Sequence, residues 1–188
     1  MRNLIYCLLV LCSLAFIPLK PNKPVTPLLI LNTKSITPIN IKIETPEIIT
    51  SSHDQFLKAI GFRESGNRYT IINKYGYMGR YQFGNSTLRG LGFKLTTDEF
   101  LNSPYIQEKA MHTLLQRNNK SLNKLIIEHE GKIVHGVLVT QSGILAAAHL
   151  GGAGSVKKWF RTGKVRQDGF GTKITSYMEQ FGGYKLNI

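Results

Sequence analysis

Glu64 is the residue of this sequence that is best placed for acid–base chemistry. It closes an amphipathic segment that begins at Phe56, and Ser65 and Gly66 follow at once. Phe56 and Ile60 precede Glu64 at helical spacing, so the sequence predicts that the carboxyl group lies on the face that points into the protein. Burial and the negative end of the helix dipole should both raise the pKa of Glu64. Such a group can act as a general acid; the plain alternative is a solvated carboxylate at a frayed helix end.

Motifs for other common chemistries are missing from the sequence. The five histidines form no His-Glu-x-x-His and no other zinc-ligand spacing, and there is no Gly-x-Ser-x-Gly. The glycine-rich stretch at residues 151–155 lacks the Gly-Lys-Ser/Thr order and the preceding strand of a phosphate-binding loop. We therefore expect neither a metal ion nor a cofactor.

The overall composition is that of a basic globular protein. The chain has 188 residues, 42% of them hydrophobic and 19% charged, which allows one domain with a proper core. A formal net charge of +13 indicates an acidic partner, which could be nucleic acid, an anionic membrane or an anionic wall polymer. The basic residues are dispersed and form no known nucleic-acid-binding motif, so charge alone supports a nucleic-acid partner.

The N-terminus resembles an export signal. A short basic start precedes an almost wholly apolar run at residues 4–14, and the small residues Ser13 and Ala15 occupy the positions that a signal peptidase reads. The sequence predicts a signal peptide over residues 1–15 and export to the periplasm or cell envelope, which argues against a nucleic-acid partner. The alternative is an uncleaved membrane anchor, although the run is shorter than the roughly 20 residues that span a bilayer.

Both cysteines lie inside this segment. A mature chain cut after Ala15 would lose Cys7 and Cys12, so it would have neither a disulfide nor a thiol. A lipoprotein signal at Cys12 is a weak alternative because Leu11, rather than a small residue, precedes it. Any contact with a membrane is expected only through this N-terminal signal or anchor.

A proline-rich segment follows, at residues 16–50. It holds six of the seven prolines and has no helical period, which predicts an extended linker. Its apolar stretches at residues 28–31 and 39–43 could instead add a strand to the domain or to a partner.

The folded domain is predicted at residues 51–188 and to be mainly α-helical. Ser51 and Ser52 each begin a capping box before the Phe56 segment. Residues 132–139 are the one convincing β-like stretch, with a turn at Gly136. Further helices are predicted at residues 85–90, after the caps Thr96 and Ser103, at residues 142–150, and, each opened by a capping hydroxyl, at residues 155–160 and 172–181.

Three segments of this domain together resemble the signatures of a known family. They are residues 59–66 (Ala-Ile-Gly-Phe-Arg-Glu-Ser-Gly), residues 75–83 (Tyr-Gly-Tyr-Met-Gly-Arg-Tyr-Gln-Phe) and residues 147–159, which begin Ala-Ala-His-Leu-Gly-Gly. In this order they are similar to the three signatures of the soluble lytic transglycosylases and goose-type lysozymes, in the lysozyme-like superfamily. The resemblance covers most of residues 56–184 and implies an α+β lysozyme-like fold with a substrate cleft.

The resemblance also implies roles for single residues. Glu64 is the expected catalytic acid and Tyr177 its support. The third signature usually reads Ala-Tyr-Asn-Ala-Gly, and Leu150 replaces its asparagine, which leaves His149 as a possible substitute; the alternative is that His149 and Tyr177 are core residues. The residues implied to bind substrate are Ser65, Gly79, Tyr81, Gln82, Phe83, His149 and Tyr177.

The chemistry implied by the resemblance needs one carboxylate. Most glycosidases use two, but in lytic transglycosylases the N-acetyl and 6-hydroxyl groups of the substrate replace the second, and the product is a 1,6-anhydro sugar. The other acids, including Asp168 and Glu108, are interpreted as helix caps or surface charges. We expect a monomer that cuts peptidoglycan glycan strands between N-acetylmuramic acid and N-acetylglucosamine. The alternatives are a hydrolytic lysozyme and an inactive glycan-binding module.

Overall fold

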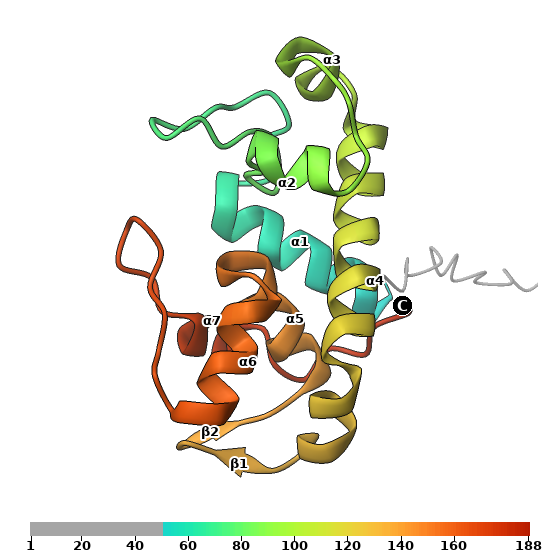
Figure 1. Cartoon of the computed structure of the whole chain (residues 1–188). Helices are drawn as coiled ribbons and strands as arrows, with labels where there is room; N and C mark the ends of the chain where they lie inside the picture. The colour runs from blue at the N-terminus through green and yellow to red at the C-terminus, as the bar shows by residue number, and fades with distance from the viewer. Residues whose placement is uncertain (1–50) are drawn as a thin grey trace, which may run out of the picture. The chain divides into compact units, whose positions relative to one another are not determined.

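The structure is a computed structural model, and it describes residues 51–188 (Figure 1). The predicted signal peptide at residues 1–15, the predicted linker at residues 16–50 and both cysteines lie outside the described residues. The described residues all belong to one compact unit. No helix among them combines the length and the apolar character needed to cross a membrane.

The helix that carries Glu64, α1 (Ser52–Ser65), begins and ends where the sequence predicts. Ser51 is its N-cap, and the Ser51 hydroxyl accepts a hydrogen bond from the backbone N–H of Asp54. Gly66 ends the helix in a left-handed conformation, with φ of 66°. Phe56 and Ile60 are fully buried, and Glu64 follows them at the same helical spacing on this inner face.

The remaining elements are mostly helices, so the mainly α prediction is confirmed. Among residues 51–188 there is one two-stranded antiparallel sheet, and it lies in the sequence between the longest helix and the last three helices. In chain order the elements are α2 (Asn85–Gly90), α3 (Thr97–Leu101), α4 (Pro104–His129), β1 (Ile133–Val134), β2 (Val137–Leu138), α5 (Gln141–Gly151), α6 (Ala153–Thr162) and α7 (Ile174–Gln180).

The predicted N-terminal caps are present in some helices and absent in others. Thr96 forms a full capping box with Glu99 before α3, and the Ser103 hydroxyl accepts from the backbone of Ile106 at the start of α4. The predicted capping hydroxyls of the last two helices are wrong. Gly152 and Lys173 occupy those N-caps, and neither makes a side-chain capping bond.

The predicted β stretch is a short hairpin. Ile133 pairs with Leu138 and Val134 with Val137, and the predicted turn at Gly136 is confirmed. Gly136 has φ of 83°, a region that favours glycine because it has no Cβ.

The core is centred on α5, which is buried along most of its length. It packs against α4, α6 and α7, and Figure 1 shows it between α4 on one side and α6 with α7 on the other. The approach of α5 to α7 is close at Gly143, where an added Cβ would lie 2.5 Å from the backbone oxygen of Met178. This packing sets the relative positions of the C-terminal end of α5 and of α7.

Replacing Gly143 with alanine should therefore destabilise the protein. The methyl group would push two helix backbones apart, at a cost of about 1–3 kcal/mol in the free energy of unfolding. Urea unfolding measures this difference. The matched control is Gly154→Ala in α6, where an added Cβ would meet no described atom within 4 Å; it should be neutral or slightly stabilising because alanine favours helix. Equal stability of the two variants would contradict the packing argument.

Candidate active site

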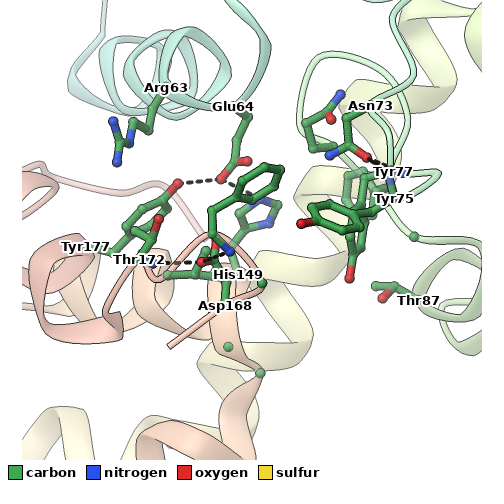
Figure 2. Close-up of a pocket in the computed structure, with 18 of the residues that line it drawn as sticks. Arg63, Glu64, Asn73, Tyr75, Tyr77, Thr87, His149, Asp168, Thr172 and Tyr177 are labelled. Carbon is green, nitrogen blue, oxygen red and sulfur yellow. Dashed lines mark hydrogen bonds and ion pairs between the residues drawn. The ribbon is translucent and has the colours of Figure 1, made fainter. Parts of the chain in front are cut away.

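Glu64 borders a cavity of 740 Å³ in the described domain. One wall comes from the turn region after α1, and the other from the end of α5, the loop before α7 and α7 itself. Figure 2 shows Glu64 in the middle with His149 and Asp168 below it, Tyr177 on one side, and Tyr75 and Tyr77 on the other.

The Glu64 carboxylate is held by residues from two other helices. Its Oε1 accepts a 2.7 Å hydrogen bond from the hydroxyl of Tyr177 on α7. The Nε2 of His149, near the end of α5, lies 3.6 Å from the same oxygen, an ion-pair distance when His149 is protonated. The Glu64 side chain is only 15% exposed. The alternative interpretation, in which Glu64 is a solvated carboxylate at a frayed helix end, is therefore wrong.

The direction of the Glu64 pKa shift differs from the expectation. Burial does raise the pKa of Glu64, as predicted, and it is the largest single influence. The polar contact and charge of His149, the hydrogen bond from Tyr177 and the charge of Arg63 act together in the opposite direction. They bring the pKa below its ordinary value. The sequence argument weighed only burial and the helix dipole, and it did not include the effect of these three neighbours on the pKa of Glu64.

Tyr177 is suited to the role of a permanent hydrogen-bond donor. Burial, the charge of Glu64 and the hydrogen bond to Glu64 raise the pKa of Tyr177 far above its ordinary value, so the phenol keeps its proton. Tyr177 is 3% exposed, and its one polar atom reaches the carboxylate. Tyr177 therefore contacts Glu64, the residue with which the resemblance pairs it.

The alternative interpretation, in which His149 is a core residue with all its hydrogen bonds made, is wrong. Its side chain is 7% exposed and faces Glu64, while its ring packs edge-on against Phe83 with centroids 5.9 Å apart. The Nδ1 atom has no hydrogen-bond partner among the described residues. A buried polar atom of this kind is uncommon outside functional sites.

Two aromatic side chains of the cavity wall contact each other. The rings of Tyr75 and Phe170 meet edge-on with centroids 4.8 Å apart, although these side chains are 51% and 60% exposed. The ammonium group of Lys74 lies 5.1 Å from the Tyr75 ring centroid and 5.5 Å from that of Phe170. Two loops that are far apart in the sequence therefore touch above the Glu64 site.

Five of the predicted site residues border this cavity and three do not. Glu64, Gln82, Phe83, His149 and Tyr177 are in its wall. Ser65, Gly79 and Tyr81 lie behind the wall, so their expected contact with a ligand is corrected to a supporting role.

Ser65 joins the end of α1 to the turn that follows. It is 6% exposed, and its hydroxyl donates to the backbone oxygen of Arg80 at 2.8 Å and accepts from the N–H of Arg68. Gly79 lets a different group come close: an added Cβ would collide with the buried side chain of Gln107, whose Oε1 accepts from the N–H of Arg80. The close approach is therefore to α4, not to a sugar.

Tyr81 and Glu108 form a polar network behind the wall. The buried Tyr81 donates to Glu108 Oε2 at 2.7 Å, while Arg80 and Tyr69 each donate to Glu108 Oε1 at 2.8 Å. Glu108 is thus a bound anchor for the turn, and its interpretation as a cap or surface charge is wrong. Burial and the contact with Glu108 raise the pKa of Tyr81 well above its ordinary value, so Tyr81 stays a donor.

Asp168 is the functional candidate that the sequence argument misread. It borders the cavity, and its Oδ1 accepts from the N–H groups of Phe170 and Thr172, which shapes the loop that carries Phe170. The Asp-Gly-Phe-Gly sequence is a turn signal that could have indicated this loop, but not its place beside Glu64. Arg63, Tyr75, Tyr77 and Asn118 were missed for the same reason.

Within residues 51–188, no three His, Cys, Asp or Glu side chains gather in a way that could hold a metal ion. Comparison of the chain with protein-family models, curated proteins and solved structures gives no match.

The contacts of Glu64 predict how its pKa responds to changes at His149. His149→Leu removes the polar contact and the charge, so burial should then dominate and raise the Glu64 pKa. His149→Gln removes only the charge and should raise the pKa less. Carbon-13 NMR of the Glu64 carboxyl carbon against pH measures both shifts. An unchanged midpoint in both variants would show that His149 does not control this proton.

Proposed function

We propose that this protein is a lytic transglycosylase that cuts the glycan strands of peptidoglycan, with Glu64 as its catalytic acid and base. The observation that carries the proposal is the buried Glu64 carboxylate, held by Tyr177 and His149 in the wall of a large cavity. The resemblance of three sequence segments to the family supports the same assignment. We propose a lysozyme-like fold on the same grounds.

The cavity offers surfaces that suit a carbohydrate. Tyr75, Tyr77 and Phe170 present exposed aromatic rings, which match the apolar faces of sugars, and Asn73, Gln82 and Thr172 add polar groups. The net charge of +13 favours association with an anionic wall polymer. We also propose that the protein acts outside the cytoplasm as a monomer, with any membrane contact through its N-terminal segment.

The proposed reaction uses one carboxyl group twice. Protonated Glu64 gives its proton to the bridging oxygen, and the bond from that oxygen to the anomeric carbon of N-acetylmuramic acid breaks. The substrate's N-acetyl group stabilises the positive charge on the sugar. The 6-hydroxyl oxygen then bonds to the anomeric carbon while the Glu64 carboxylate takes the hydroxyl proton. The products are a free hydroxyl end and a 1,6-anhydro end, and no water is consumed.

The contacts of Glu64 favour its carboxylate form, which acts in the second step. Tyr177 donates to the carboxylate and so fixes its orientation after the proton has left. His149 provides a nearby positive charge when protonated, which stabilises the anionic form. Both contacts therefore assist the base step, whereas the acid step uses the protonated fraction of Glu64, which the lowered pKa makes smaller.

A hydrolytic lysozyme is the second candidate, and the position of Asp168 favours it. Asp168 is a second carboxylate in the cavity wall, and a hydrolytic mechanism of the inverting kind uses a second carboxylate to activate water. Its Oδ1 is already bound by two backbone N–H groups, so only Oδ2 is available for water. This makes Asp168, rather than the anchored Glu108, the acid to test first.

Glu64→Gln should remove nearly all activity on purified peptidoglycan. The amide keeps the shape of the side chain but cannot transfer a proton, so we expect a loss on the order of 100-fold or more. Release of soluble fragments measures activity, and circular dichroism checks the fold. Wild-type turnover by the folded variant would refute the assignment of Glu64.

Asp168→Asn separates transglycosylation from hydrolysis. If the substrate supplies its own nucleophile, this variant should keep most of the activity, and the fragments should carry 1,6-anhydro ends. Mass spectrometry distinguishes these from reducing ends because the two differ by one water. The control is Glu179→Gln, which removes an exposed acid on α7. Reducing ends, together with an Asp168→Asn loss as large as that of Glu64→Gln, would identify a hydrolase.

A further inference from the structure

Two loops of the cavity wall have the same backbone structure. One is residues 73–77, Asn-Lys-Tyr-Gly-Tyr, and the other is residues 168–172, Asp-Gly-Phe-Gly-Thr. In each loop the backbone N–H of the first residue donates to the carbonyl oxygen of the fifth, and the carbonyl oxygen of the first accepts from the N–H of the fourth. The side-chain Oδ1 of the first residue accepts from the N–H groups of the third and the fifth. The fourth residue is a glycine with φ of 81° in both loops.

Each loop carries an aromatic ring on its third residue, and these two rings contact each other. They belong to Tyr75 and Phe170, and their edge-on contact has a centroid distance of 4.8 Å. The ammonium group of Lys74 lies near both rings, which adds cation–π attraction to the contact. The backbone of the second loop also packs on the first, because an added Cβ at Gly169 would lie 4.0 Å from the Tyr75 ring. The hydrogen bonds within each loop therefore hold the rings where they meet.

The two walls of the cavity meet at two separate places. At the first, Glu64 of one wall accepts the hydrogen bond from Tyr177 of the other. At the second, Tyr75 of the first wall contacts Phe170 of the second. All four residues border the cavity, and Figure 2 shows Tyr75 on the opposite side of Glu64 from Tyr177. Walls that touch at two places can surround a chain that lies between the contacts.

We propose that the two loops close over a glycan strand bound at Glu64, so that the protein cuts strands from a free end rather than in the middle. This inference rests on the proposed function. A free end can pass under the joined loops, whereas an internal segment enters only after Tyr75 and Phe170 have separated. Separation costs the ring contact and the attraction of Lys74 to both rings. The contact between the loops therefore selects the end of the strand.

The sizes of the fragments released over time distinguish the two modes of cutting. The substrate is long, uncross-linked peptidoglycan strands, and the wild-type protein should release small fragments from the start without fragments of middle length. Tyr75→Ala and Phe170→Ala should each raise the ratio of middle-length to small fragments by about tenfold, because an aromatic pair contributes roughly one factor of ten. The double variant should give no higher ratio, because either change alone removes the same contact.

Tyr75→Phe and Tyr77→Ala are the matched controls. Tyr75→Phe keeps the ring and should keep the wild-type fragment pattern. Tyr77→Ala removes the other aromatic ring of the same loop, which borders the cavity but is not part of the contact with Phe170, so it should slow cutting without changing the ratio. Middle-length fragments from the wild-type protein at the earliest times, or an unchanged ratio in alanine variants that fold by circular dichroism, would overturn the inference while leaving the proposed function intact. Failure of the wild-type protein to cut these strands at all would overturn both.

Discussion

Burial of the Glu64 carboxylate is the constraint on which the rest of the site depends. A carboxylate that is 15% exposed needs compensation for the water it has lost, and here a phenol and an imidazole provide it. These come from α7 and α5, while Glu64 ends α1. The close packing of α5 on α7 at Gly143 therefore has a direct chemical role, because it holds Tyr177 and His149 at the distances that the carboxylate requires.

The second signature segment, residues 75–83, has two structural roles, and the sequence alone does not show which residue has which role. Gln82 and Phe83 form part of the cavity wall, whereas Gly79 and Tyr81 point back toward α4. The polar network around Glu108 fixes this turn from behind, so the wall residues are placed by buried hydrogen bonds. This turn therefore has one face toward the cavity and another toward α4.

Local signals in the sequence account for what could be predicted. The Ser51 cap, the Thr96 capping box and the Gly136 turn depend on residues a few positions apart, and each is present. The net direction of the Glu64 pKa shift could not be obtained in this way, because Tyr177 lies 113 positions from Glu64 along the chain. Asp168 was misread for the same reason: its turn is local, but its position in the cavity wall comes from tertiary packing.

Charge acts on two length scales in this protein. The net charge of +13 acts over a long range, and its field is screened beyond about 8 Å at physiological ionic strength. The cavity wall contains the carboxylates of Glu64 and Asp168, so the local charge there differs in sign from the net charge of the chain. The proton of Glu64 is therefore governed at short range, by burial and by the contacts with His149 and Tyr177, rather than by the net charge of the chain.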